Sequence, residues 1–240
     1  MSTVFYFKQF GILQQHSSMK VGTDGVLLGA WATVSNVNRI LDVGTGTGLI
    51  ALMLAQRTSG QAHIDAVEPD NGAIADAREN FRQCQWSNSL HLFHQSLQQF
   101  TPAHAYDLIV CNPPYFNKAL TSPDRNRTMA RHTTTLKHTD LADFASHWLT
   151  PRGRLAVILP VEEARQFKTT AAGKGLYAIR TTCVKTTPDK PVKRWLMEFS
   201  HIHLPEEKSE LTLLESDGSR TVAYQHLTGD FYLNGKSALM

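Results

Sequence analysis

Long apolar runs are absent from this chain of 240 residues, and cysteine is scarce. No run reaches the roughly 20 apolar residues that cross a bilayer, and the first residues lack the basic and then apolar stretch of a secretory signal. The three cysteines, Cys84, Cys111 and Cys183, fit neither a disulfide framework nor a zinc-type spacing. We therefore expect a cytoplasmic protein that has no membrane segment and no metal site.

Charge of one sign is not in large excess either, and no repeat or low-complexity tract is present. The formal net charge is +3, a mild basic balance that permits a nucleic-acid partner without requiring one. An apolar share of 42% is ordinary for a globular protein. The length suits one large domain, or one domain with extensions.

Strand and helix patterns alternate along most of the chain. After a hairpin near 4–15, strands are expected at 39–43, 62–67, 89–94, 106–111, 153–159, 176–184, 194–202 and 210–214. Helices are expected at 24–33, 48–57, 71–83, 140–149, 161–173 and 222–231, the first with Asp24 as its N-cap. This order predicts an α/β fold with a doubly wound, mostly parallel sheet and helices on both faces. Strands without a helix between them near the end predict one antiparallel edge strand.

A glycine-rich turn follows the strand at 39–43. It reads Gly44-Thr45-Gly46-Thr47-Gly48 and runs directly into a helical apolar pattern. Strand, glycine turn and helix form the nucleotide-binding opening of a doubly wound sheet, because glycines let a ligand approach the backbone closely. The dinucleotide fingerprint needs a third glycine where Leu49 stands, which weakens the case for an NAD-dependent oxidoreductase.

Two acidic residues narrow the choice of ligand. Asp42 precedes the first glycine by two positions; its carboxylate disfavours a phosphate and suits a cationic ligand with an ammonium group. Glu68 ends the next strand, where a carboxylate binds both hydroxyls of a ribose. Either residue alone is commonly an ordinary loop carboxylate. Together they favour S-adenosylmethionine over NAD.

The strand at 106–111 ends in Asn112-Pro113-Pro114-Tyr115. Two prolines fix φ and remove two backbone donors, so the Asn112 carboxamide and the neighbouring carbonyls are held at set angles beside an aromatic ring. Two fixed acceptors and a ring suit a planar amine, although an isolated Asn-Pro-Pro is commonly only a turn. Ligands of such sheets bind beyond the carboxyl ends of the strands. We therefore expect this segment, the glycine turn, Glu68 and Ser96 to meet in one crevice.

These motifs resemble the class I S-adenosylmethionine-dependent methyltransferases that act on amino groups, with a Rossmann-like sheet of seven strands. Within them, the chain is similar to the bacterial tRNA1(Val) adenine-N6 methyltransferases over most of 5–200. The specific block is Met19-Lys20-Val21-Gly22-Thr23-Asp24-Gly25-Val26-Leu27-Leu28-Gly29-Ala30-Trp31. The resemblance implies S-adenosylmethionine-dependent N6-methylation of adenosine 37, next to the anticodon, with the anticodon stem-loop of the tRNA as partner.

The resemblance also assigns roles to residues. It implies a catalytic site of Asn112, Pro113, Pro114 and Tyr115. The implied cofactor site comprises Lys20, Gly22, Thr23, Asp24, Asp42, Gly44, Thr45, Gly46, Gly48, Glu68, Pro69, Ser96 and Asn112. The family commonly carries an Asp after the third strand, and this chain has His94-Gln95-Ser96-Leu97 there. Either Ser96 or Gln95 replaces that contact to the cofactor adenine, or the contact is lost.

A long polar segment, 112–139, carries the expected substrate-binding residues Lys118, Arg127, Arg131, His132 and Lys137. A second basic group comprises Lys185, Lys190, Lys193 and Arg194. Clustering of positive charge beside the expected crevice favours RNA contact, and a solvated surface is the alternative for each residue taken singly.

We expect a single domain with a methyltransferase core at 36–205. Residues 1–35 form an N-terminal extension that contributes to the cofactor and RNA site, and residues 206–240 form a C-terminal extension. Other amino-group substrates stay open at this point, namely a release-factor glutamine, an rRNA guanine-N2 and a DNA adenine-N6. A nucleotide-binding protein without catalysis is the alternative from another functional class.

Overall fold

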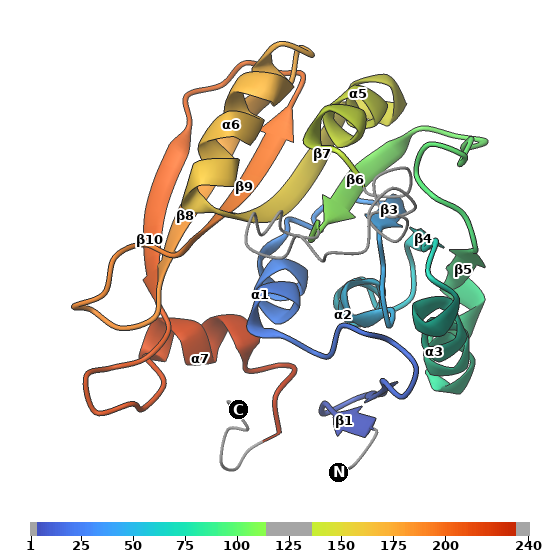
Figure 1. Ribbon diagram of the computed structural model, residues 1–240, viewed down its shortest axis with the longest axis horizontal. Coiled ribbons are helices and arrows are strands. Elements are labelled where there is room, and N and C mark those ends of the chain that lie inside the picture. Colours follow the sequence, from blue (N-terminus) through green and yellow to red (C-terminus); the bar gives the residue numbers. More distant parts are fainter. Residues whose placement is uncertain (1–3, 114–135, 234–240) are drawn as a thin grey trace, which may run out of the picture.

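The computed structural model describes residues 4–113 and 136–233, and a mixed β-sheet forms its centre (Figure 1). The strands lie in the order β10-β8-β9-β7-β6-β3-β4-β5. Their bounds are β3 Arg39–Val43, β4 His63–Val67, β5 Leu90–Phe93, β6 Tyr106–Cys111, β7 Leu149–Pro160, β8 Tyr177–Lys185, β9 Arg194–Ser200 and β10 Glu207–Thr212. Only β9 runs antiparallel to its neighbours, so the predicted α/β class with a mostly parallel sheet is confirmed.

Two details of the sheet differ from the expectation. The sheet has eight strands rather than seven, because β10 pairs in parallel with β8 and extends the sheet. The antiparallel strand, β9, lies inside the sheet between β7 and β8 rather than at its edge. The reason is the order of connections. The helix after β7 carries the chain past one strand position to β8, and β9 then turns back in a hairpin and fills the position between β7 and β8.

Alternating side chains divide the core into two layers. Ile40 and Leu108 point to one face of the sheet, whereas Leu41 and Ile109, each one residue further along, point to the other. The first face is covered by α1 Thr23–Trp31, α2 Leu49–Arg57, part of α3 Asn71–Gln83, and α7 Val222–Thr228. The second face is covered by α5 His138–Trp148 and α6 Val161–Ala172, which lie across the sheet from α1 in Figure 1.

The ends of the described chain pack against each other. The hairpin of β1 Val4–Tyr6 and β2 Gly11–Leu13 holds Phe7 and Phe10 with their ring centroids 4.9 Å apart. The Lys8 backbone N–H donates to the Phe231 carbonyl at 2.8 Å. Both rings are buried, and they pack the hairpin against the far end of the described chain.

Helix α1 begins one residue earlier than expected. Gly22, in an extended conformation, is its N-cap, and the predicted N-cap, Asp24, lies inside the first turn. A carboxylate there is favoured by the positive end of the helix dipole. Asp24 also accepts a hydrogen bond from Arg194 Nε at 2.9 Å, which ties the start of α1 to the start of β9.

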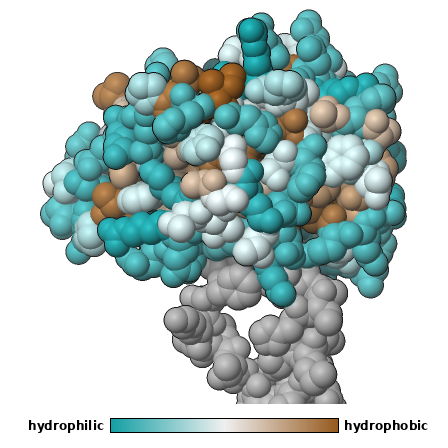
Figure 2. All heavy atoms as spheres, turned by 90° about the horizontal axis from the view of Figure 1, so that it is seen from above, coloured by the Kyte–Doolittle hydropathy of each residue, from teal (hydrophilic) through white to brown (hydrophobic). Residues whose placement is uncertain are grey.

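The molecular surface is mostly hydrophilic where Figure 2 shows it, with apolar spots separated by polar side chains. Large apolar side chains that are exposed, such as Tyr6, Ile202 and Val222, come from different parts of the chain. Within residues 4–113 and 136–233, no helix combines the length and the apolar character that a membrane span needs.

Candidate active site

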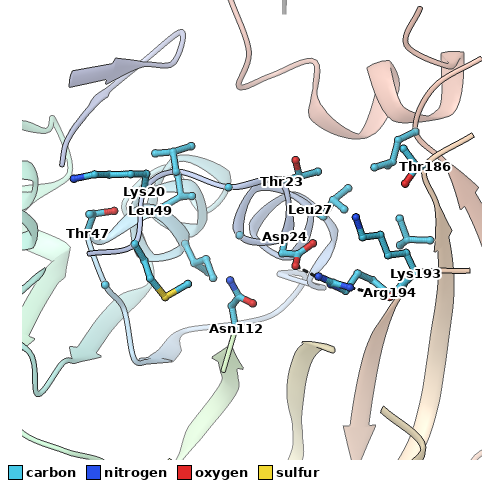
Figure 3. Close-up of a pocket in the computed structure, with 18 of the residues that line it drawn as sticks. Lys20, Thr23, Asp24, Leu27, Thr47, Leu49, Asn112, Thr186, Lys193 and Arg194 are labelled. Atoms are coloured by element: carbon cyan, nitrogen blue, oxygen red, sulfur yellow. Dashed lines mark hydrogen bonds and ion pairs between the residues drawn. The ribbon is translucent and has the colours of Figure 1, made fainter. Parts of the chain in front are cut away.

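Two adjoining cavities lie along the carboxyl edge of the sheet. One, of about 430 Å³, is lined by the segment from Met19 to Gly25, the glycine turn, the end of β8 and the start of β9 (Figure 3). The other, of about 290 Å³, is lined by Glu68, Pro69, Ser96 and the residues around them. Both cavities are lined by Met19, Gly44, Gly46 and Asn112, so they form one continuous crevice. The structure thus brings together Gly44 and Gly46 of the turn, Glu68, Ser96, Asn112 and Pro113.

The glycine turn presents open backbone to this crevice. Gly44, Gly46 and Gly48 have φ values of +66°, +59° and +84°, in the left-handed region that side chains disfavour. A Cβ added to Gly44 or Gly46 would meet no atom within 4 Å, whereas one added to Gly48 would lie 2.5 Å from Phe81 Cε1. The first two glycines therefore leave room for a ligand, and the third is needed for packing against α3.

Asp42 lies beneath the turn and lines neither cavity. Its Oδ2 accepts hydrogen bonds from Thr45 Oγ1 at 2.6 Å and from the Ala51 N–H at 3.1 Å, so it fastens the turn to α2. Within the described parts of the chain, its buried Oδ1 has no hydrogen-bond partner. Burial raises the Asp42 pKa to about 7, against the lowering effect of the two hydrogen bonds. Asp42 is thus a buried acid that supports the turn from inside.

Glu68 lines the second cavity and is oriented by two backbone donors. Its Oε2 accepts from the Gly46 N–H at 2.9 Å and its Oε1 from the Asp70 N–H at 2.8 Å. Burial raises the pKa of this carboxyl, and the two hydrogen bonds oppose the rise. Each oxygen has a further lone pair, so the group can accept from two neighbouring hydroxyls of a ligand.

Ser96 lines the second cavity, and Gln95 lines neither. Gln98, which the sequence interpretation did not single out, lines it as well. The Ser96 hydroxyl lies 3.2 Å from Gln99 Oε1 and can donate to it. Of the two residues considered as a replacement for the expected Asp, the geometry therefore favours Ser96.

Asn112 lies at the junction of the two cavities, directly after β6, and Pro113 lines the second one. The start of α1 lies beside it, because a Cβ on Gly25 would lie 3.9 Å from Asn112 Nδ2. Lys137 is the N-cap of α5 and lines neither cavity. The remaining expected residues of this region are outside the described ranges, namely Pro114, Tyr115, Lys118, Arg127, Arg131 and His132.

Comparison with known proteins assigns the family. The family model described as the methyltransferase small domain matches residues 16–160, which include the glycine turn and Asn112. The chain is 47% identical over 232 residues to the tRNA1(Val) (adenine(37)-N6)-methyltransferase of Trichodesmium erythraeum, covering 95% of this chain and 97% of the relative. It is 42% identical over 235 residues to the protein of that name from Proteus mirabilis, covering 95% and 93%. The chain belongs to this methyltransferase family.

Solved structures support the fold. A predicted O-methyltransferase from Agrobacterium tumefaciens matches with a TM-score of 0.68 at 16% identity, covering 87% of this chain and 96% of the other. A glycopeptide N-methyltransferase complexed with S-adenosyl-L-methionine matches with a TM-score of 0.54 at 13% identity, covering 75% and 99%. The expected family and fold are therefore both confirmed.

The N-terminal part of this methyltransferase folds back over the crevice. We call residues 13–22 the strap; Ser17, Ser18 and Met19 line the second cavity, and its last four residues, 19–22, line the first. Lys20 Nζ donates to the carbonyls of Gln14 at 2.5 Å and Ser17 at 2.9 Å, which closes the strap on itself. Lys20, Gly22, Thr23 and Asp24 thus lie where the sequence interpretation expected them, on the crevice wall.

Two polar side chains of α3 hold the strap, and the sequence interpretation missed both. Asp76 accepts from the N–H groups of His16 at 2.9 Å and Ser17 at 2.8 Å. The Asn80 carboxamide accepts from the Leu13 N–H at 2.7 Å and donates to the Leu13 carbonyl at 2.9 Å and the Thr47 carbonyl at 2.8 Å. Asn80 therefore links the strap to the glycine turn. The available signal was two polar residues, four apart, on the otherwise apolar face of this helix.

We predict that Asn80→Ala weakens cofactor binding by about tenfold, the equivalent of about 1.4 kcal/mol. The variant removes both hydrogen bonds from the half-buried backbone of Leu13, so the strap loses its fixed place over the crevice. Calorimetric titration with S-adenosylmethionine measures the effect. Gln83→Ala, an exposed change on the same helix, is the matched control. Equal affinities of the Asn80→Ala variant and the wild type would show that the strap needs no such anchor.

A second prediction concerns pH. The folded-state pKa of Asp42, about 7, lies above the ordinary value of 3.8, so the folded protein binds more protons than the unfolded chain between these values. The contribution of this group to stability is therefore fully present below about pH 4 and is lost as the pH rises to about 7. In denaturant titrations without ligand, the free energy of unfolding of the wild type should fall relative to that of Asp42→Asn across this window. A constant difference between the two proteins would contradict the assignment.

Proposed function

We propose that this methyltransferase transfers a methyl group from S-adenosylmethionine to the N6 amine of adenosine 37 in tRNA1(Val). The observation that carries the proposal is the position of Asn112 at the junction of two cavities, in a chain of this family. An amine held by Asn112 would therefore be accessible to a ligand bound in either cavity. A tRNA substrate also agrees with the expected location in the cytoplasm.

The residues of the crevice fit the cofactor. Gly44 and Gly46 leave an open cradle that a Cβ would fill, and Glu68 can accept from both ribose hydroxyls. Ser96 and Gln98 line the second cavity and would contact the adenine there. Thr23 and Asp24, with the glycine turn, would surround the methionine end in the first cavity. The cofactor supplies an electrophilic methyl group on a sulfonium.

The contribution of Asn112 and Pro113 is to orient the target amine. The exocyclic nitrogen of adenine is a poor nucleophile, because its lone pair is delocalised into the ring. The amine would donate its two N–H groups to the Asn112 side-chain oxygen and the Pro113 carbonyl. These two hydrogen bonds draw the nitrogen toward tetrahedral geometry and free its lone pair. No general base is required for this step, since methylation acidifies the amine. Positioning supplies most of the rate enhancement.

The proposed substrate also has to present an unstacked adenine. A base that undergoes chemistry on its exocyclic amine must leave the stack to enter a pocket. Single-stranded loops, where proteins commonly read RNA sequence, make this easier. Two contacts with this substrate stay predictions. They are stacking of the base on Tyr115, and phosphate contacts from Lys118, Arg127, Arg131, His132 and Lys137.

We predict that Asn112→Ala retains cofactor binding and loses methyl transfer by about 100-fold or more, because the target amine is no longer oriented. Calorimetry with S-adenosylmethionine and transfer of a labelled methyl group to tRNA1(Val) measure the two properties separately. Asn88→Ala, an exposed change of the same type, is the control. Turnover by Asn112→Ala at the wild-type rate would exclude the proposed role of the carboxamide.

The substrate itself is tested with a panel. Purified enzyme and labelled cofactor are incubated with tRNA1(Val), rRNA, duplex DNA and release factor, and the modified nucleoside in tRNA is mapped in cells with and without the gene. The expected result is N6-methyladenosine at position 37 that disappears with the gene. If another member of the panel is labelled and the tRNA is not, that molecule would replace tRNA1(Val) as the proposed substrate.

A further inference from the structure

The first cavity extends past α1 and ends in a basic rim. Four basic side chains line this cavity, Lys20, Lys185, Lys193 and Arg194, against one acidic side chain, Asp24. The lining therefore carries a formal surplus of three positive charges, as large as that of the entire chain. Positive charge concentrated in a concave site attracts anions far more strongly than the same charge spread over a surface.

The rim is built by structured elements. The Lys193 N–H donates to the Val184 carbonyl at 2.8 Å, which fixes its backbone at the start of β9, and its side chain is exposed. Lys185 ends β8, with its Nζ 3.0 Å from Glu210 Oε1. Arg194 contacts Asp24 on the opposite side of the cavity, where Figure 3 shows the pair between Asn112 and Lys193. Lys185 and Arg194 thus belong to strands, and Lys193 lies directly before β9 with its backbone hydrogen-bonded to β8.

The wall below the rim is apolar and comes from the C-terminal part of the chain. The N–H groups of Leu213 and Leu214 donate to the carbonyls of Lys185 at 3.0 Å and Thr186 at 2.9 Å, which continues the pairing of β10 with β8. Leu213, Leu214 and the buried Tyr224 line the cavity there. An apolar wall below a basic rim suits a nucleotide, whose base has an apolar face and whose phosphate is an anion.

The order of the strands places this rim on the substrate side. Asn112 follows β6, whereas Glu68 and Ser96 follow β4 and β5 on one side of it. Lys193 and Lys185 lie at β9 and β8, on the other side. If the cofactor occupies the crevice over β3, β4 and β5, the second reactant has to reach Asn112 from the side of β9 and β8.

We propose that this part of the cavity binds an RNA nucleotide next to the target adenosine. Lys193 neutralises its phosphate, and its base lies against Leu213 and Leu214. The proposal rests on the proposed function and adds a second nucleotide site to it. It also gives the C-terminal segment a function in the substrate site, since Leu213 and Leu214 lie outside the expected methyltransferase core.

The test compares Lys193→Glu with Arg152→Glu, which makes the same charge change in an exposed residue near the amino end of β7, at the opposite edge of the sheet. The probe is a synthetic anticodon stem-loop of tRNA1(Val), titrated at several salt concentrations. Lys193→Glu should bind this RNA about tenfold more weakly, with the salt slope reduced by about one. Arg152→Glu should match the wild type, and both variants should keep wild-type affinity for S-adenosylmethionine. Unchanged RNA affinity and salt slope in Lys193→Glu would overturn the proposal.

A second measurement does not depend on a variant. The same stem-loop, with 4-thiouridine beside the target adenosine, is cross-linked to the wild-type protein by long-wave ultraviolet light. Cross-linked peptides should include Leu213 and Leu214; cross-links confined to other segments would overturn the proposal. Methylation of the unmodified stem-loop by the wild type is measured in parallel. Its absence would refute the proposed function, whereas normal methylation with either negative result would refute only the second nucleotide site.

Discussion

The glycine turn is the structural feature on which the crevice depends, and two side-chain carboxylates and one side-chain amide help to hold it in place. Backbone partners satisfy part of the turn, since the N–H groups of Gly44 and Thr45 donate to the Val67 carbonyl at 2.9 and 3.1 Å, and side chains bind other polar groups in and beside it. Asp42 binds the Ala51 N–H beyond the turn, Glu68 binds the Gly46 N–H and Asn80 binds the Thr47 carbonyl. These side chains come from β3, from the end of β4 and from α3. The turn is therefore fixed on three sides and open on the fourth, toward the crevice.

Two of the side chains that support the turn, Asp42 and Glu68, are buried acids. Burial raises the pKa of both Asp42 and Glu68, and for Asp42 the charge of Glu68 adds to the effect. The ligand-free protein thus holds two acids in an environment that disfavours their ionised forms. A cation in the crevice would reverse this preference by attraction. The structure thus gives Asp42 the role of fastening the turn to α2, beneath the crevice rather than in its lining.

Features that depend on neighbouring residues could be predicted from the sequence, whereas features that depend on distant partners could not. The alternation of strands and helices gave the α/β class, and the glycine turn, Glu68, Ser96 and Asn112 meet because each follows a strand. Asp76 and Asn80 hold backbone about 60 residues earlier in the chain, a pairing with no local pattern. The position of β9 inside the sheet depends on how many strand positions the connection from β7 to β8 passes, and the sequence does not give that number.

Helix α1 joins the two halves of the site, because both of its ends are tied to β8 and β9. At its start, Asp24 accepts from Arg194. Just beyond its end, the buried Glu198 accepts from the Thr33 N–H at 2.7 Å and from Arg180 Nε at 3.2 Å.

Between these two ends, the same helix packs against α2. A Cβ on Gly25 would lie 3.1 Å from Leu49 Cδ2, and a Cβ on Gly29 only 2.7 Å from Met53 Sδ, so α1 packs closely against α2, which follows the glycine turn. Cores packed this tightly transmit displacement rather than absorb it. Helix α1 therefore connects β8 and β9, which carry the basic rim, with α2 and the glycine turn that precedes it.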